Sequence, residues 1–282
     1  MSEKVAIVTG ANKGLGLAIV KGLCKKFDGI TYLTSRNVKR GLEACEELEK
    51  LNYKPQFHQL DVSDVDSIRK FFEYLKNKHQ GIDILVNNAG ILFLKDAQEP
   101  IKYQKEQTVL VNFSALVNFT EAILPLMKNN SRIVNISSSS GHLSRIPSED
   151  LRKRFKNPNL TLNELTELIT LYSEAIRRNK DVEDGWGGNP YVISKVAVNA
   201  YTFILHRRLQ DRGILVNCVH PGYVKSDMTR GGGSITPEEG AVIPLKLALE
   251  TSTGGQYFWN NGTVVPWDGP DPRGYIDGRK DL

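Results

Sequence analysis

Two tyrosine–lysine pairs in this sequence have the spacing that acid–base chemistry can use. Tyr191 and Lys195 lie four positions apart in "NPYVISK", and Tyr74 and Lys78 lie four positions apart in "YLKNK". On a helix, residues at this spacing share one face and can contact each other. By spacing alone, either pair could be a proton donor with its electrostatic partner. Other features of the sequence must show which pair has that role.

A lysine beside a tyrosine matters because a free phenol holds its proton too tightly for exchange near neutrality. The pKa of an unperturbed tyrosine is about 10. A lysine charge about 5 Å away, at an effective dielectric constant of about 20, favours the phenolate by roughly 3 kcal/mol, or about two pKa units. A tyrosine placed in this way can serve as an acid in a reduction and as a base in an oxidation.

A glycine-rich turn near the start of the sequence predicts a phosphate-binding site. The strand-like run at 5–9 leads directly into "TGANKGLG", where Gly10, Gly14 and Gly16 precede the apolar helical stretch "LAIVKGL". Glycines at such a turn let backbone N–H groups approach a pyrophosphate at a helix N-terminus. A plain structural turn uses the same residue. The position between the first strand and the first helix of an α/β pattern favours nucleotide binding.

Two cations near this turn indicate which nucleotide is bound. Dehydrogenases that select NAD usually carry an acid after the second strand, whereas an arginine there accommodates the 2′-phosphate of NADP. The second strand ends in "TSRN", with Arg36 and no acid, and Lys13 lies within the glycine turn. The sequence therefore predicts NADP(H). The alternative is that Arg36 is only a solvent-exposed start to the next helix.

The elements that position these residues alternate between short β-branched runs and longer amphipathic stretches. Several runs are apolar on both faces, as in strands buried within a parallel sheet. The alternation predicts a doubly wound, Rossmann-type α/β sheet with right-handed crossovers. No linker rich in Pro, Gly or Ser divides the sequence, so residues 1–282 are interpreted as a single domain. The expected strands lie at 5–9, 30–35, 56–61, 83–88, 132–137 and 214–219.

The helix that carries the second tyrosine–lysine pair explains that pair without catalysis. Ser63, with Asp66 three residues on, is expected to begin this helix. Tyr74 and Lys78 lie near its C-terminal end, where cations suit the helix dipole. A structural role is therefore sufficient for them.

Residues 142–188 interrupt the strand–helix alternation and predict a helical insertion before the "NPYVISK" helix. A serine with acids after it in "PSEDL" is typical of one helix start, and Thr161 with Glu164 forms the pattern of a capping box at a second. The second helix is expected to bury one apolar face. That face consists of Leu165, Ile169, Tyr172 and Ile176.

Composition and charge are those of an ordinary globular protein, with 40% hydrophobic residues, 24% charged residues and a net charge of +5. Short basic clusters such as 152–154 are more typical of solvated helix faces than of a nucleic-acid-binding stripe. Three scattered cysteines suggest neither a disulfide framework nor a metal site. No secretory signal and no apolar run near membrane-spanning length is visible, so we expect a cytoplasmic protein that binds neither membrane nor nucleic acid.

Six short motifs occur in the order found in short-chain dehydrogenases/reductases, and the chain resembles that family over nearly its whole length. The motifs are "TGxxxGxG" (9–16), "NNAG" (87–90), "VN" (111–112), "NISSxxG" (135–141), "YxxxK" (191–195) and "PG" (221–222). Within the family the chain is most similar to cytosolic NADPH-dependent carbonyl reductases, which also carry a long insertion before the catalytic tyrosine. Tyr74 and Lys78 belong to none of these motifs and do not fit their order along the chain.

The resemblance implies hydride transfer from nicotinamide to a carbonyl, with four catalytic residues. Tyr191 would protonate the developing alkoxide, Ser138 would hydrogen-bond the carbonyl oxygen, Lys195 would hold the nicotinamide ribose and acidify Tyr191, and Asn112 would anchor a proton-relay water. Ser138 is chosen by register from a run of four serines, which can also be turn chemistry. Asn112 can alternatively be a helix-interior polar residue with a satisfied hydrogen bond.

The resemblance also implies which residues bind the cofactor and the substrate. Asp61 and Val62 would contact the adenine of the cofactor. Val224 and Ser226 would contact its carboxamide and the phosphate side. The full set expected to bind NADPH or NADP+ is Gly10, Asn12, Lys13, Gly14, Leu15, Gly16, Arg36, Asp61, Val62, Asn88, Ala89, Gly90, Val111, Tyr191, Lys195, Pro221, Gly222, Val224 and Ser226. A loop at 223–236 is expected to cover the substrate, which would contact Ser138, Ser139, Tyr191, Tyr223 and Trp259.

The activity implied is NADPH-dependent reduction of small ketones, aldehydes or quinones to alcohols. One alternative is an NADP-dependent dehydrogenase of a specific secondary alcohol, because the chemistry is reversible. Another is a catalytically silent redox sensor that binds NADP(H). In such a protein we would expect the catalytic tyrosine or lysine to be replaced, whereas both are present in this sequence. Many relatives pair through the surface near the tyrosine helix, which the insertion is placed to cover, so we expect a monomer. His220, just before Pro221, is expected to be structural.

Overall fold

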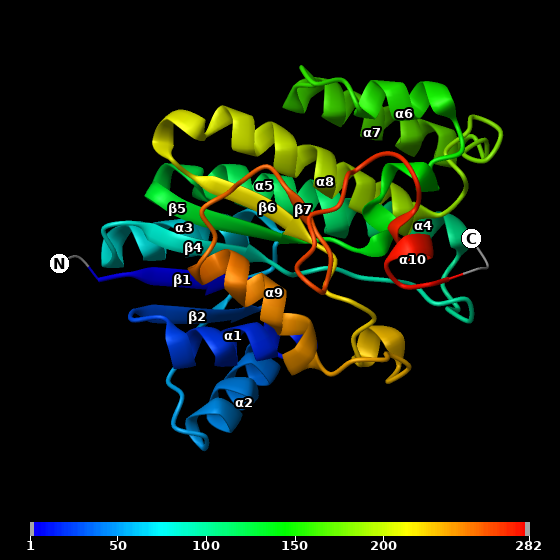
Figure 1. The fold of residues 1–282 in the computed structure, drawn as a ribbon. Helices are drawn as coiled ribbons and strands as arrows, with labels where there is room; N and C mark the ends of the chain where they lie inside the picture. Colours follow the sequence, from blue (N-terminus) through cyan, green and yellow to red (C-terminus); the bar gives the residue numbers. More distant parts are fainter. Residues whose placement is uncertain (1–2, 280–282) are drawn as a thin grey trace.

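A single sheet of seven parallel strands forms the centre of the computed structural model of this protein, which describes residues 3–279 (Figure 1). The strand order is β3-β2-β1-β4-β5-β6-β7. This is the predicted doubly wound α/β arrangement, because the chain starts in the middle of the sheet and winds outward in both directions. The strands are β1 Val5–Val8, β2 Ile30–Ser35, β3 Gln56–Gln59, β4 Ile82–Asn87, β5 Met127–Ile136, β6 Leu215–Val219 and β7 Tyr257–Phe258.

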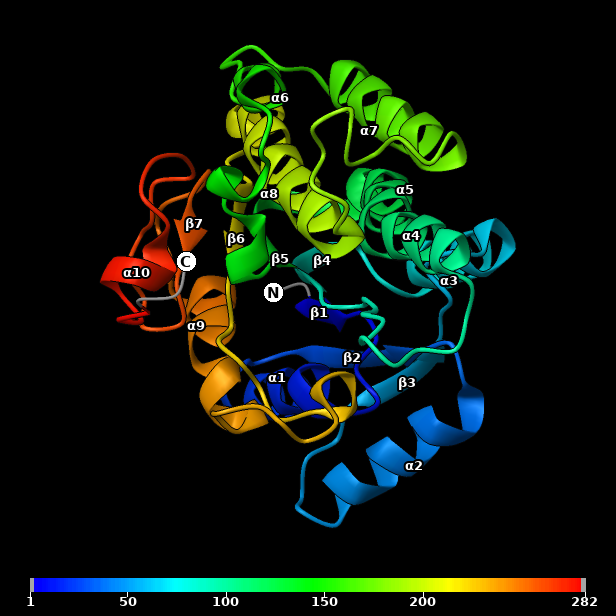
Figure 2. The ribbon, with the colours of Figure 1, turned by 90° about the vertical axis from the view of Figure 1, so that its right-hand side faces the viewer.

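Alternate residues of the central strands pack on opposite faces of the sheet, which explains why the strands are apolar throughout. In β1, Val5 and Ile7 face one hydrophobic cluster while Ala6 and Val8 face the other. Helices cover both faces (Figure 2). One layer contains α1 Gly14–Lys26, α2 Val38–Glu49 and α9 Pro237–Leu249, and the other contains α3 Val65–Lys78, α4 Ile101–Val109, α5 Ala115–Ile123 and α8 Pro190–Arg208.

The six expected strands are all present, with ends that shift by a few residues, whereas β7 was not expected. It has two residues, too few to show an alternating pattern. The start of α3 was also predicted wrongly. Its N-cap is Asp64, whose carboxylate accepts from the Asp66 backbone N–H at 2.9 Å, while the Ser63 hydroxyl donates to Asp61 at 2.6 Å. The Asp64 carboxylate, one residue closer to the helix than Ser63, therefore accepts the capping hydrogen bond in place of the Ser63 hydroxyl.

The stretch 142–188, which was predicted as a helical insertion, lies outside the layer of α4 and α8. It contains α6 Glu149–Phe155 and α7 Leu162–Arg177. The hydroxyl of Ser148 caps α6, and the capping box between Thr161 and Glu164 starts α7. The expected apolar face of α7 is buried in the same hydrophobic cluster as α8. Lys105 of α4 and Asp181 after α7 form a largely buried ion pair of 2.6 Å that ties the insertion to the domain.

The stretch 101–126, which joins α4 and α5 through a π-helical turn at Leu110–Ser114, is long and apolar enough by composition to cross a membrane. This corrects the expectation that no run approaches that length. Buried core helices pass the same test, and 56% of the apolar window is buried inside the protein. The stretch therefore gives weak grounds for a membrane span, and its burial is that of a core helix.

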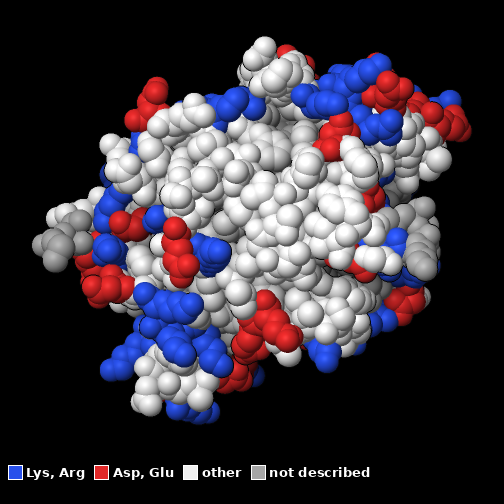
Figure 3. All heavy atoms as spheres, viewed as in Figure 1, with Lys and Arg blue, Asp and Glu red and all other residues white. Residues whose placement is uncertain are grey.

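Charged side chains on the face of Figure 1 gather toward its rim, and the centre of that face carries few of them (Figure 3). Lys and Arg cluster over the region of α1 and α2, with acidic side chains beside them. Within residues 3–279, no group of three or more His, Cys, Asp and Glu side chains is placed to hold a metal ion. Cys24, Cys45 and Cys218 are free.

Candidate active site

A cavity of about 1120 Å³ lies at the carboxyl ends of the strands and contains nearly all the residues predicted from the sequence. This is the crevice where open α/β sheets bind ligands. Every predicted cofactor residue lines it, as do Ser138, Ser139 and Tyr223. Asn112 and Trp259 do not. One face of the cavity is closed by the loop 223–236, whose two arms meet in a bridge between Val224 and Ile235.

The glycine turn between β1 and α1 has the shape that a pyrophosphate needs. Gly10 has a φ of +60°, and a Cβ on it would lie 2.9 Å from the Cα of Ala89. A Cβ on Gly16 would lie 2.5 Å from the Asn88 amide nitrogen. The N-terminus of α1 has no side-chain cap and no acid in its first turn, so its N–H groups stay open for an anion.

The loop after β4 is locked onto this turn by hydrogen bonds. The Asn88 side-chain amide donates to the carbonyls of Thr9 and Gly10 at 2.9 and 3.0 Å. The Thr9 hydroxyl accepts from the backbone N–H groups of Asn88 and Ala89, both at 3.0 Å. Two loops that are distant in sequence thus form one rigid wall of the cavity.

The cations predicted for a 2′-phosphate lie together, but one of them already has a partner. Lys13 and Arg36 both line the cavity. The Lys13 ammonium pairs at 2.6 Å with Asp227, which lies in the loop 223–236. Arg40, in the first turn of α2, is close enough to help lower the pKa of Asp227, after the larger effect of Lys13. Arg40 was missed, although it lies only four residues after Arg36.

The tyrosine and the serine that were predicted to be catalytic, Tyr191 and Ser138, lie close enough for their side chains to form a hydrogen bond. Tyr191 is near the start of α8, where the Asn189 side chain caps the helix and Pro190 occupies its first position. Ser138 follows β5, and its hydroxyl accepts from the Ser140 backbone N–H at 3.2 Å. Burial raises the pKa of Tyr191, and a hydrogen bond with the Ser138 side chain opposes that rise.

Lys195 lies beneath the tyrosine and not beside its hydroxyl. Its ammonium donates to the Ile136 carbonyl at 2.8 Å and is 5.6 Å from the centre of the Tyr191 ring. Burial lowers the pKa of Lys195 to about 8. Loss of hydration disfavours the charged forms of both side chains, and the acidification of Tyr191 by Lys195 stays a prediction.

The Tyr74–Lys78 pair does have the geometry that acidifies a phenol. Lys78 donates to the Tyr74 hydroxyl at 2.8 Å. Burial alone would raise the pKa of Tyr74, but hydrogen bonds with Lys78 and Tyr32 lower it. Neither residue lines the cavity. A tyrosine that has a perturbed pKa but does not line the cavity fits the predicted structural role.

Asn112 lies behind the wall of the cavity, in the π-helical turn between α4 and α5. Its side chain accepts from the Ile91 N–H at 2.7 Å and donates to the Ile91 carbonyl at 2.9 Å and to the Ser194 hydroxyl at 3.3 Å. These contacts match the alternative of a satisfied buried polar residue. π-Helical turns of this kind often occur at functional sites.

Trp259 is completely buried, so it does not wall the pocket as predicted. Its ring packs against His220 with the ring centres 4.4 Å apart, and His220 lines the cavity in its place. Burial lowers the pKa of His220 to about 3, so the imidazole is neutral. Sequence reasoning also missed other lining residues, among them Asn260 and, near the C-terminus, Arg273, Asp277 and Arg279.

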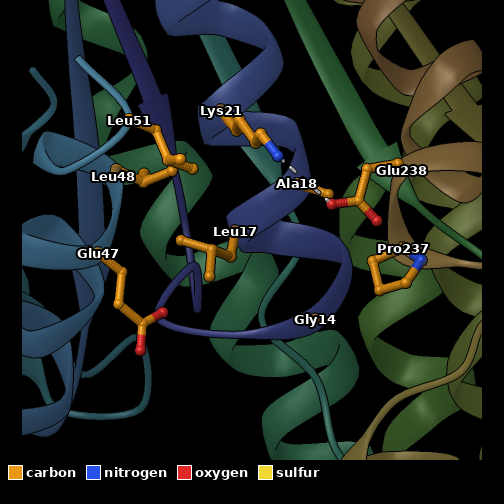
Figure 4. A pocket seen from close by; sticks show the side chains of 9 residues that line it. All are labelled: Gly14, Leu17, Ala18, Lys21, Glu47, Leu48, Leu51, Pro237 and Glu238. Carbon is orange, nitrogen blue, oxygen red and sulfur yellow. Dashed lines mark ion pairs between the residues drawn. The ribbon is translucent and has the colours of Figure 1, made fainter. Parts of the chain in front are cut away.

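A second hollow, of about 240 Å³, lies outside α1 between the ends of α2 and α9 (Figure 4). It is lined by apolar side chains such as Leu17 and by an ion pair of 3.8 Å between Lys21 and Glu238. Gly14 is the one lining residue that the two hollows share. The second hollow contains none of the predicted catalytic groups.

Known proteins are similar to this chain in sequence and in fold. Residues 4–148 and 182–234 match the family described as short chain dehydrogenase, and the unmatched stretch between them holds α6 and α7. Carbonyl reductase (NADPH) 3 of Rattus norvegicus is 42% identical over 253 residues, which cover 88% of this chain and 91% of that protein. Carbonyl reductase (NADPH) 1 of Sus scrofa is 38% identical over 283 residues, 97% of each.

Among solved structures, salutaridine reductase from Papaver somniferum superimposes with a TM-score of 0.83 at 30% identity, over 91% of this chain and 99% of that chain. The family match extends over more than half of the sequence, and Tyr191, Lys195 and Ser138 line one cavity with the glycine turn. On both grounds this protein belongs to the short-chain dehydrogenase family.

Proposed function

We propose that this protein is an NADPH-dependent carbonyl reductase that converts ketones, aldehydes or quinones to alcohols. One observation carries the proposal. Tyr191 and Ser138 line the same cavity as the glycine turn, so a proton donor faces the place where a bound nicotinamide would lie. The names of the rat and pig relatives support both the cofactor and the substrate class.

NADPH, when bound, supplies the hydride, and the protein supplies the proton and the orientation. Tyr191 donates the proton to the carbonyl oxygen, which the Ser138 hydroxyl holds in place. Burial raises the pKa of Tyr191, so the phenol carries the proton that it donates in the reduction. Lys195, fixed by the Ile136 carbonyl, is positioned beneath the ring to bind the ribose.

The residues around the glycine turn fit the rest of NADPH. The open N-terminus of α1 receives the pyrophosphate, and Lys13 with Arg36 receives the 2′-phosphate, with Arg40 as a third cation nearby. To bind the 2′-phosphate, Lys13 must break its ion pair with Asp227 and pair with the phosphate instead. Asp61 and Val62 line the adenine end. Asn112 acts by holding Ile91 and the π-helical turn, and its role in a proton relay stays a prediction.

The direct test is a steady-state assay of NADPH and NADH oxidation against a panel of ketones, aldehydes and quinones. We expect consumption of NADPH that depends on the carbonyl compound. Oxidation of neither cofactor with any member of the panel would instead favour a silent NADP(H)-binding protein. Turnover of secondary alcohols with NADP+, without any carbonyl reduction at neutral pH, would favour the dehydrogenase alternative.

We also propose that the protein is a cytoplasmic monomer. The insertion packs on α4 and α8, and the ion pair between Lys105 and Asp181 fixes it there, over the surface that many relatives use for pairing. Sedimentation velocity at micromolar concentration should give the mass of one chain. A stable dimer or tetramer would show that the insertion does not prevent association.

A further inference from the structure

The loop that carries Ser138 is held in place by a part of the chain that lies beyond the family match. The second matched stretch ends at residue 234, whereas β7 and the segment 266–279 follow it. Figure 2 shows β7 beside β6, with this C-terminal segment and its short helix α10, Pro272–Tyr275, next to them. Two aromatic side chains from this part of the chain donate hydrogen bonds to backbone carbonyls of the serine loop.

The first of these hydrogen bonds reaches the backbone of Ser138 itself. The Tyr257 hydroxyl, from β7, donates to the Ser138 carbonyl at 2.7 Å, and the Gly141 backbone N–H donates to the same carbonyl at 2.9 Å. On the other side of Ser138, the Ser137 backbone N–H donates to the Val219 carbonyl of β6 at 2.8 Å. The backbone on both sides of Ser138 is therefore fixed, which limits where its hydroxyl can point.

The second hydrogen bond holds the turn that follows Ser138. Residues Ser139–Gly141 form a single 3-10 turn. The Trp267 indole donates to the Gly141 carbonyl at 2.8 Å, and the Asn199 side chain of α8 donates to the same carbonyl at 2.9 Å. The Leu143 backbone N–H donates back to the Trp267 carbonyl at 3.0 Å. The C-terminal segment is thus attached to the serine loop at both carbonyls that limit the turn.

Tyr257 is itself fixed and remains a hydrogen-bond donor. The residue is completely buried, and β7 pairs it with Cys218 of β6. Its carbonyl accepts from the Val265 backbone N–H at 2.8 Å. Burial raises the pKa of Tyr257 well above its ordinary value, so the phenol keeps its proton throughout the pH range of an assay. Tyr257 does not line the cavity, so any effect that it has on a reaction there passes through Ser138.

Ser138 connects this support to the reaction. Its side chain lies close enough to Tyr191 for a hydrogen bond, and both residues line the cavity. A substrate oxygen held between the two hydroxyls has to lie within hydrogen-bond distance of each, about 2.6–3.2 Å. A misplacement of about 1 Å at a catalytic centre can lower a rate by about 100-fold. The position of the Ser138 backbone therefore matters for the rate.

We propose that Tyr257 is a positioning residue that fixes Ser138 for catalysis, with Trp267 holding the turn behind it. The inference rests on the proposed carbonyl reductase activity and adds to it a residue from outside the family match. The alternative is that Tyr257 only fills the core beneath the C-terminal segment. In that case the loss of its hydroxyl would affect the stability of the protein and would not act through Ser138.

A double-mutant cycle between Tyr257 and Ser138 separates these two roles. Tyr257→Phe keeps the ring and removes the hydroxyl, and it should lower the rate of ketone reduction by about tenfold. Ser138→Ala should lower the same rate by about 100-fold. The two losses should not multiply, so in the Ser138→Ala protein Tyr257→Phe should change the rate by no more than about twofold. Rates are measured in single turnovers with enzyme in excess over NADPH, so that slow variants also give a rate.

The matched control is Tyr201→Phe in α8. Tyr201 is also completely buried, and its hydroxyl donates to Glu121 at 2.9 Å, away from the cavity. Its loss should leave the rate within about twofold of the unaltered enzyme, and NADPH affinity should stay the same in both tyrosine variants. A general effect of losing a buried hydroxyl would lower both rates alike.

Trp267→Phe gives a second variant that acts on the same turn. It should lower the rate by a few-fold, roughly a factor of three, because the Gly141 carbonyl keeps its bond from Asn199. This loss should also disappear in the Ser138→Ala protein. If Tyr257→Phe does not fold, the cycle with Trp267→Phe decides the proposal.

An unchanged rate in Tyr257→Phe would overturn the positioning role. A tenfold loss that persists in the Ser138→Ala protein would do the same, because the effect would then not pass through the serine. In both cases the carbonyl reductase proposal stands, since the unaltered enzyme is active. An unaltered protein that reduces no carbonyl compound would instead refute the proposed function, and the positioning role with it.

Discussion

Tyr191→Phe should lower the turnover of a simple ketone by at least about 100-fold, which is the lower range for removal of a positioned general acid. The substitution removes one oxygen and keeps the ring that packs above Lys195. NADPH affinity should change little, because the substitution leaves the glycine turn, Lys13 and Arg36 untouched. Turnover is measured at saturating NADPH, and affinity is measured by fluorescence titration.

Two further variants separate the proton donor from its surroundings. Lys195→Ala should lower turnover and also weaken NADPH binding, because this lysine has the additional role of binding the ribose. Tyr74→Phe should do neither, although Tyr74 has the closer lysine contact of the two tyrosines. A quinone accepts hydride with less help from an acid, so the loss in Tyr191→Phe should be smaller with a quinone than with a ketone. Near-normal ketone turnover by Tyr191→Phe would exclude "NPYVISK" as the catalytic stretch.

The central strands and the inserted helices could be predicted because their residues carry the signal locally. β1 is apolar at every position since both of its faces are covered, and α7 begins with a capping box whose two members are three residues apart. β7 could not be predicted from its two residues, because its place is set by pairing with β6. The cap of α3 was predicted one residue too early, at Ser63, because Ser and Asp are both good N-caps and only geometry separates them.

Residues of the candidate site could be predicted where a sequence motif contains them. They could not be predicted where their position depends on contacts between residues that are distant in sequence. Lys13 was expected to meet a phosphate, but its pairing with Asp227 joins positions 214 residues apart. Trp259 was expected at the pocket wall and is core, while its neighbour His220 was expected to be structural and lines the cavity. Burial disfavours the charged forms of both Tyr191 and Lys195, which could not be predicted because a spacing of four residues says nothing of how much water each side chain has lost.

Arg36→Asp should abolish or reverse a preference for NADPH over NADH. In the unaltered enzyme we expect kcat/KM to favour NADPH by some 30- to 1000-fold, since two cations on a phosphate contribute about 2–4 kcal/mol. The new carboxylate would repel the 2′-phosphate and could accept from the 2′-hydroxyl of NADH. Arg178→Asp, which changes the charge of an exposed arginine paired with Asp184 after α7, is the control and should leave the preference intact. Equal efficiency with both cofactors in the unaltered enzyme would refute the prediction, as would a preference that survives Arg36→Asp. In the second case Lys13 and Arg40 would be the cations that select the phosphate, and reversing either charge should then lower the preference in the same assay.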